Sequence, residues 1–216
     1  MSDHTHHLIE GRAAALPLAN LDTDQIMPKQ FLRGIDKAGL AQGLLYDLRV
    51  DGAGQARPEF VLNRPAWAGC NVLLAGPNFG CGSSREHAVW GLQQAGFEAV
   101  VAASFGEIFY SNAVNNRLLP VMVSDEAAQT LLAEAAKLHG PLDLRIDLAA
   151  LTVSSPTLSA PFSLSPRHQR LLMEGLDMIG ATLQQRDAIE AFAQAHWAAQ
   201  PWVRDVASRT RARLLG

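Results

Sequence analysis

Segments typical of strands alternate with segments typical of helices between residues 71 and 140, and this alternation constrains the fold more than any other feature of the chain. Short apolar runs that are typical of buried strands lie at 71–76, 98–104 and 118–123. Patterns typical of helices follow them at 85–97, 105–116 and 124–140. Strands and helices that alternate at this spacing form βαβ units, so we expect an α/β fold whose sheet is at least partly parallel.

The segments on either side extend this pattern. Two further short strands are predicted within 142–155, and one helix is predicted at 165–180 with others after it. Residues 8–27 mix short apolar runs with turn residues and predict no regular element. Neither an internal repeat nor a linker is evident, so we predict one domain, 1–216, with a helical C-terminal extension over roughly 165–216.

The composition of the chain limits the classes of partner. Hydrophobic residues make up 48% of its 216 residues and charged residues 18%, which allows a substantial core. A net charge of −3 is too balanced to predict nucleic acid or an anionic membrane as a partner, and no apolar run is long enough to span a bilayer. The N-terminus lacks the basic and then apolar pattern of a signal peptide, so we expect a cytoplasmic protein.

Cysteine and histidine usage predicts no metal or cofactor on this chain. The two cysteines, Cys70 and Cys81, are too few for a disulfide framework or an iron–sulfur cluster. We interpret Cys81, which stands between two glycines, as a small space-filling residue. The histidines His4, His6 and His7 fit a polar terminus better than a metal site.

The stretch "GPNFGCGSSREHAVWGL", residues 76–92, carries most of the chemistry. Its structural interpretation is a helix start, with Ser83 and Glu86 as a capping box and with Gly80 and Gly82 allowing a tight turn. This interpretation leaves the second serine and Arg85 unexplained.

The functional interpretation of the same stretch is an anion site. Free N–H groups at a helix start attract anions, and Arg85 can bind a carboxylate or phosphate with two hydrogen bonds. The lysine of a P-loop is missing, and Arg85 stands where a dinucleotide fingerprint needs its third glycine, so a nucleotide-binding domain is disfavoured. The residues therefore favour an anion pocket with a serine hydroxyl inside it.

A second polar segment, "NLDTDQI", resembles the start of an EF-hand loop, because Asn20, Asp22 and Asp24 recur at two-residue spacing. Gln25 stands where that loop needs a glycine and Phe31 where it needs a glutamate, which argues against calcium. The residues alone favour an Asx-type turn.

Several of these motifs together resemble one family. "GCGSSREHA" resembles the Gly-x-Gly-Ser-Ser-Arg-Glu-His segment of the swivelling domain of the aconitase superfamily. "PLANLDTDQIMPKQFLRGI", "FGEIFYSNAVNNRLLPV" and "LLMEGLDMIGATL" resemble, in order, blocks of the small subunit of bacterial 3-isopropylmalate dehydratase. The resemblance covers most of the chain.

The resemblance implies a fold, an activity and a partner. The fold would be the aconitase-type swivelling β/β/α domain with a mixed sheet. The activity would be that of a hydro-lyase in leucine biosynthesis, which isomerises 2-isopropylmalate to 3-isopropylmalate by dehydration and rehydration. The chain would be active only with a large subunit, which would hold a 4Fe–4S cluster, and would bind no cofactor itself. The alternatives are a related dehydratase of citramalate/citraconate or homoaconitate, and a non-catalytic anion-binding module.

The resemblance also implies roles for single residues. Ser83 matches the general base, which takes a proton from carbon. Ser84 and Arg85 would bind a substrate carboxylate, and Asp24 would orient a basic group at the active site. Whether Asp24 has this role or only forms a turn stays open at this point.

Three further residues follow in "FLRGI". Arg33 resembles the arginine that reaches the distal carboxylate, and a surface arginine is the alternative. Leu32 and Ile35 would line an apolar pocket for the isopropyl group, or would be ordinary core residues.

Two other groups of polar or aromatic residues receive interpretations of their own. We interpret Asn112, Asn115 and Asn116 as capping and turn residues. Trp197 and Trp202, if exposed, predict a partner surface in the C-terminal extension.

Overall fold

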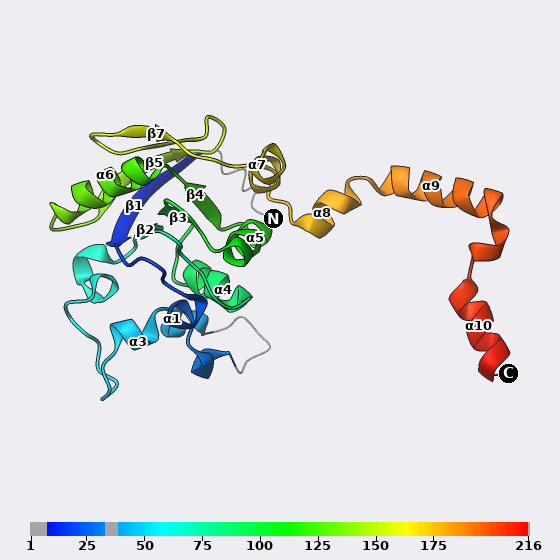
Figure 1. Ribbon diagram of the computed structural model, residues 1–216, viewed down its shortest axis with the longest axis horizontal. Coiled ribbons are helices and arrows are strands. Elements are labelled where there is room, and N and C mark those ends of the chain that lie inside the picture. The colour runs from blue at the N-terminus through cyan, green and yellow to red at the C-terminus, as the bar shows by residue number, and fades with distance from the viewer. Residues whose placement is uncertain (1–7, 33–38, 216) are drawn as a thin grey trace. The chain divides into compact units, whose positions relative to one another are not determined.

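A computed structural model of the chain describes residues 8–32 and 39–215 (Figure 1). The chain divides into two compact units, Met1–Asp177 and Met178–Gly216. The first unit holds the sheet and both apolar clusters, and the second is helical. The prediction of one domain over 1–216 stays a prediction.

The described part of the first unit contains one sheet in the strand order β4-β3-β2-β1-β5-β6-β7. The strands are β1 (Leu8–Leu16), β2 (Val72–Ala75), β3 (Ala99–Ala102), β4 (Leu119–Met122), β5 (Leu142–Asp147), β6 (Thr152–Ser154) and β7 (Ser159–Pro161). β1 to β4 pair in parallel, whereas β5 runs antiparallel to β1, and β6 and β7 continue antiparallel. The mixed, partly parallel sheet expected from the sequence is therefore confirmed.

Helices cover the parallel half of the sheet on both faces (Figure 1). They are α1 (Thr23–Ile26), α2 (Leu40–Gly43), α3 (Tyr46–Arg49), α4 (Glu86–Gln94), α5 (Glu107–Asn115), α6 (Asp125–Ala136) and α7 (Pro166–Met173). Short 3₁₀ turns lie at η1 (Lys29–Phe31), η2 (Val61–Asn63) and η3 (Pro65–Trp67). One apolar cluster joins α1, α4 and α5 to the sheet, and the other joins α6 and α7 to the opposite face.

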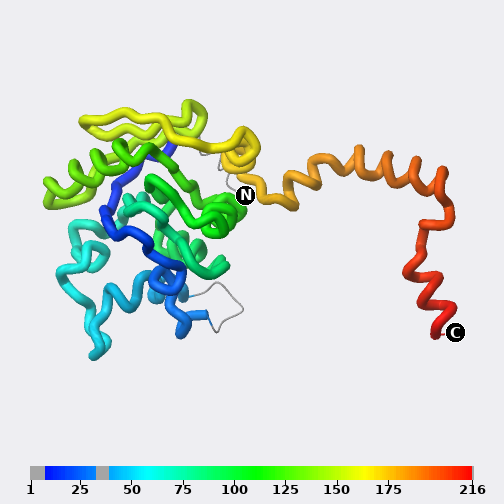
Figure 2. Tube along the Cα trace, viewed as in Figure 1, coloured from blue at the N-terminus to red at the C-terminus, as the bar shows by residue number. Residues whose placement is uncertain are grey.

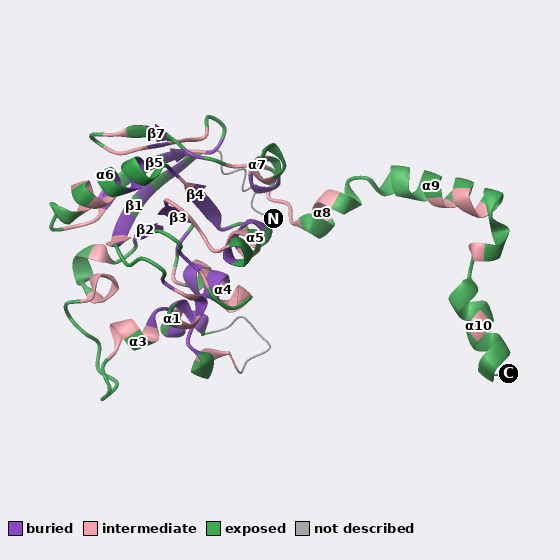
Figure 3. Ribbon diagram, in the orientation of Figure 1, coloured by how far each residue is buried: buried purple, intermediate pink, exposed green. Residues whose placement is uncertain are grey.

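Burial on both faces explains why β2 and β3 read as continuous apolar runs. Every residue of these two strands is buried (Figure 3). Leu73 packs in the cluster beneath α4, whereas its neighbours Val72 and Leu74 pack in the cluster beneath α6. Strands of a covered parallel sheet lack the alternation of a half-exposed strand.

β1 is the central strand, yet its sequence did not predict it. Its residues, "LIEGRAAAL", include a glycine and three alanines, which are poor strand formers. Pairing with β2 on one side and β5 on the other makes this segment a strand, and its path through the middle of the unit is visible in Figure 2. A side chain at Gly11 would clash with Val72, so the glycine permits close packing at this position.

The second unit consists of α8 (Met178–Leu183), α9 (Arg186–Ala199), η4 (Pro201–Val203) and α10 (Val206–Leu215). None of these elements contains a buried residue (Figure 3). The single helix predicted at 165–180 was wrong, because α7 ends before Gly175, whose φ of 61° is left-handed, and α8 starts at Met178.

Candidate active site

Three loops meet at the carboxyl ends of β1, β2 and β3. The Gly80 N–H donates to the Leu21 carbonyl at 2.8 Å, which joins the loop after β2 to the loop after β1. On the other side, the Phe79 N–H donates to the Ser104 carbonyl at 3.1 Å, and the Gly106 N–H donates to the Phe79 carbonyl at 2.9 Å. The loop after β2 therefore lies between the loops after β1 and β3, just as β2 lies between β1 and β3 in the sheet.

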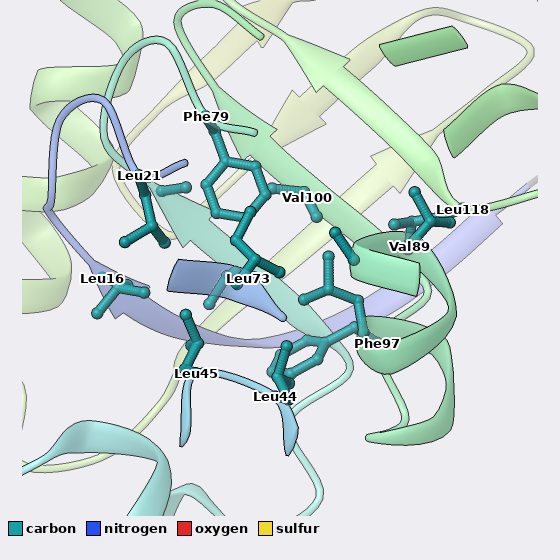
Figure 4. Packing of buried hydrophobic residues seen from close by; sticks show 14 of the residues in the cluster. Leu16, Leu21, Leu44, Leu45, Leu73, Phe79, Val89, Phe97, Val100 and Leu118 are labelled. Atoms are coloured by element: carbon teal, nitrogen blue, oxygen red, sulfur yellow. The ribbon is translucent and has the colours of Figure 1, made fainter. Parts of the chain in front are cut away.

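Two apolar side chains anchor these loops in the core. Leu21 and Phe79 are almost fully buried and point into the cluster around Leu73 and Val100 (Figure 4). Leu21 lies directly before Asp22, and Phe79 lies directly before the glycine turn that leads to the serines, so the two anchors fix where these segments leave the sheet.

Glycines allow the loops to approach this closely. Gly80 has a φ of 73°, and a side chain there would clash with the ring of Phe109. A Cβ at Gly106 would lie 2.5 Å from the Gly80 carbonyl oxygen. The turn that the sequence assigned to Gly80 is thus confirmed, and backbone packing as well as conformation requires the glycine.

The predicted capping box at the start of α4 was wrong. The helix begins at Glu86 with Arg85 in the N-cap position, and no side chain caps it. Glu86 instead accepts a hydrogen bond from the side chain of Asn116 at 2.5 Å. The capping interpretation therefore does not account for Ser83.

Several backbone N–H groups at this helix start have no acceptor within the described residues. They belong to Gly82, Ser83, Ser84, Glu86 and His87. Free donors at a helix N-terminus attract a negative charge. The loop therefore offers a set of unused donors beside two serine hydroxyls.

Asp24 and Arg85 form an ion pair across the two loops. The Arg85 side chain is 15% exposed, and that of Asp24 is 44% exposed. The turn-forming role considered for this segment belongs to Asp22, whose carboxylate accepts from the Gln25 N–H at 2.7 Å in a capping box. Asp24 is therefore not needed as a cap and is available for Arg85.

Ser83 and Ser84 lie in the open part of the loop. Both are exposed, and neither hydroxyl has a hydrogen-bond partner in the part of the chain that the structure describes. The carbonyl of Ser83 accepts from the Thr23 hydroxyl at 2.9 Å and from the Arg85 N–H at 2.8 Å. The backbone of Ser83 is thus held while its hydroxyl is free to meet a ligand.

The other predicted site residues are less informative. Leu32 is half-buried and packs against the core cluster beside α1, at the end of η1. Arg33 and Ile35 lie outside the described residues. Cys81 is half-buried, and its thiol donates to the Asn20 carbonyl at 3.4 Å, which agrees with a space-filling role.

Two contributions to the site were missed by the sequence. Thr23 lies in the motif that was singled out for Asn20, Asp22 and Asp24, and its burial could not be predicted from the sequence. Asn116 is the C-cap of α5, as its predicted turn role requires. It also accepts from the Trp90 indole at 2.9 Å and donates to Glu86, and so ties α4 to α5.

The chemistry available here is limited. The donors and Arg85 can hold a carboxylate, and Ser83 can exchange a proton. Among the described residues, no cluster of three or more histidine, cysteine, aspartate or glutamate side chains could hold a metal ion. Nor does any described helix have the length and apolar character needed to cross a bilayer.

Comparison with known proteins defines first a class and then a family. The family model of the aconitase C-terminal domain matches residues 5–126, which include the parallel strands β1 to β4 and the three loops of the site. A second family model, that of the C-terminal domain of the 3-isopropylmalate dehydratase small subunit, matches residues 178–206. The fold is therefore that of an aconitase C-terminal domain. The chain belongs to the family of 3-isopropylmalate dehydratase small subunits.

Individual relatives agree with this family. The chain is 61% identical over 209 residues to 3-isopropylmalate dehydratase small subunit 1 of Chromobacterium violaceum, a match that covers 97% of this chain and 98% of the relative. The small subunit of Phenylobacterium zucineum is 48% identical over 196 residues, 90% of this chain and 96% of its own. The crystal structure of a 3-isopropylmalate dehydratase from Methanocaldococcus jannaschii matches with a TM-score of 0.61 and 28% identity, and the match covers 86% of this chain and 99% of that chain.

Proposed function

We propose that this chain is the small subunit of a hydro-lyase that isomerises 2-isopropylmalate to 3-isopropylmalate in leucine biosynthesis. One observation carries the proposal. In a chain of this family, the exposed hydroxyl of Ser83 lies among unused N–H donors beside the Asp24–Arg85 ion pair. The site therefore combines a group that can take a proton with groups that can bind a carboxylate.

Ser83 is the proposed general base. Its Oγ takes the proton from the carbon next to the one that carries the hydroxyl group, and gives a proton back when water adds at the other position. A serine hydroxyl needs help to act as a base, because its alkoxide is unstable in water. The free N–H groups at the start of α4 and the cationic Arg85 would supply that stabilisation.

Ser84 and Arg85 are the proposed ligands of a substrate carboxylate. Arg85 can bind a carboxylate with two parallel hydrogen bonds, and Ser84 offers its N–H and its hydroxyl. Asp24 holds the guanidinium through the ion pair and so fixes its direction. We further propose that Arg33 binds the distal carboxylate and that Leu32 and Ile35 contact the isopropyl group.

The leaving hydroxyl group is the part of the reaction for which the described residues offer no partner. We infer that a 4Fe–4S cluster on the large subunit supplies a Lewis acid for it, as the family resemblance implies. We expect the two chains to work together in the cytoplasm, with a small dicarboxylate as substrate.

Reconstitution tests the proposal. The chain is mixed under anaerobic conditions with the cluster-loaded large subunit from the same cell, and formation of the unsaturated diacid is followed by its ultraviolet absorbance. We expect turnover that needs both chains and prefers 2-isopropylmalate over citramalate. Turnover of only the rival substrate would keep the mechanism but assign the chain to another pathway. A stable but inactive complex would contradict the catalytic proposal.

A further inference from the structure

We propose that Thr23 is a positioning residue for this reaction, and that its hydroxyl aims the peptide between Ser83 and Ser84 at the substrate. The inference rests on the proposed roles of Ser83 and Ser84. Thr23 is the single buried polar residue of the described part of the chain and is only 1% exposed. Its hydroxyl donates to the carbonyl of Ser83 at 2.9 Å, across 60 positions of sequence.

The Thr23 hydroxyl is not needed for local structure. Threonine at a helix start often bonds to its own helix. In α1, however, Asp22 and Gln25 already form the capping box, and the Thr23 N–H donates to the Cys81 carbonyl at 2.9 Å. The hydroxyl is therefore used for the loop after β2 alone.

Thr23 and Asp24 hold alternate residues of that loop. The Thr23 N–H binds Cys81, the Thr23 hydroxyl binds Ser83, and the Asp24 carboxylate binds Arg85. Between the first two contacts lies Gly82, with a φ of 96°. Inside the loop the Ser83 carbonyl also accepts from the Arg85 N–H at 2.8 Å, and the Thr23 hydroxyl is the contact that ties this carbonyl to α1.

The direction of this peptide determines where two active groups point. In a trans peptide the C=O and the following N–H point in opposite directions. When the buried Thr23 hydroxyl draws the Ser83 carbonyl towards α1, the Ser84 N–H must point away from α1. That N–H is one of the donors without a partner among the described residues. Thr23 thus acts on the donor set through the backbone, without touching the substrate.

Substitution of Thr23 separates this role from simple packing. Thr23→Val keeps the branched shape and removes the hydroxyl, whereas Thr23→Ser keeps the hydroxyl and removes a methyl group. In the complete two-chain enzyme we expect Thr23→Val to lower kcat by about tenfold or more, with a KM within about threefold of the unmodified value. The reason is that the Ser83–Ser84 peptide would no longer be held in the orientation that the reaction needs. Thr23→Ser should retain most of the kcat. Thr130→Val is the matched control, since Thr130 is exposed on α6 and its hydroxyl bonds only within that helix.

An isotope effect provides the second measurement. With substrate deuterated at the carbon that loses its proton, Thr23→Val should show a larger primary isotope effect than the unmodified enzyme, because proton transfer becomes slower than the other steps. The ratio does not depend on how much of the variant is folded. An unchanged isotope effect, or equal loss of kcat in Thr23→Val and Thr23→Ser, would overturn the inference. Full activity of Ser83→Ala would instead overturn the proposed function.

Discussion

At the scale of single residues, the site depends on two acidic residues of one motif that have different partners. Asp22 caps α1, and Asp24 pairs with Arg85. The sequence presented both as members of one polar motif and left open whether Asp24 forms a turn. Only the structure separates them, because the capping bond of Asp22 and the ion pair of Asp24 involve different partners. The catalytic assignment of Asp24 itself stays a prediction.

Asp24→Asn tests whether this carboxylate orients Arg85. We expect kcat to fall by about tenfold because Arg85 loses its fixed direction. The change in KM should be smaller, since the substrate carboxylate also loses a competitor for the guanidinium. Steady-state kinetics of the two-chain enzyme measure both values. Asp143→Asn, on the exposed side of β5, is the control, and equal kinetics of the two variants would contradict the role.

Cys70 gives a pH-dependent prediction. Burial raises the pKa of its thiol above the ordinary value of 9.0, and the nearby Arg12 opposes this with a smaller effect. The folded chain therefore keeps the thiol neutral at a pH where the unfolded chain ionises it, so stability is lost as the pH rises above about 9. Urea unfolding between pH 7 and pH 10 should show a smaller loss for Cys70→Ala than for the unmodified chain. An equal loss of unfolding free energy with pH in the two proteins would show that the Cys70 thiol does not contribute to the pH dependence.

At the scale of elements, Asn116 joins α4 to α5. Its side chain accepts from Trp90 and donates to Glu86 and to the Asn112 carbonyl, and its own carbonyl accepts from Gln93. All these groups are partly buried, and a buried polar group is costly when its partner is removed. The first turn of α4, which follows the serine loop, is therefore held by the neighbouring helix.

Asn116→Ala should lower the free energy of unfolding by about 2 kcal/mol, because Trp90 and Glu86 each lose a hydrogen-bond partner. Chemical denaturation followed by circular dichroism measures the loss. The double variant Glu86→Gln with Asn116→Asp reverses donor and acceptor in the hydrogen bond between these two side chains. It should be more stable than Asn116→Asp alone, in which two carboxylates face each other. Additive effects of the two substitutions would contradict direct coupling.

At the scale of the whole molecule, the predictable part of the fold is the part in which local pattern and packing agree. The strands at β2, β3 and β4 and the helices between them followed from apolar runs and helical periodicity. β1 did not, because its Gly11 and its alanines form a strand only through pairing with two neighbours. Thr23 was missed for a similar reason, since its partner lies 60 positions away. The residues alone favoured an anion pocket that contains Arg85 and a serine hydroxyl, and the motif resemblance added the role of Ser83 as the general base.

The second unit supports a prediction about assembly. Trp202 is 64% exposed and Phe192 70%, whereas Trp197 is half-buried with Arg204 over its ring. Both apolar clusters consist of residues of the first unit. A chain ending at Asp177 should therefore keep the unfolding temperature of the first unit but bind the large subunit more weakly, as sedimentation of the mixture would measure. If the shortened chain bound the large subunit as tightly as the full chain, the second unit would not be part of the interface.

The central claim is that the Ser83 hydroxyl is the base of a two-chain hydro-lyase, and the kcat of Ser83→Ala measures it most directly. The variant is assayed with the cluster-loaded large subunit beside Ser111→Ala, a control on the exposed surface of α5. We predict that Ser83→Ala loses at least about 100-fold in kcat, the usual effect of removing a general base, with folding and complex formation unchanged. A kcat within about twofold of Ser111→Ala, together with a loss of about 1 kcal/mol of stability, would show that Ser83 serves the helix start and would contradict the account.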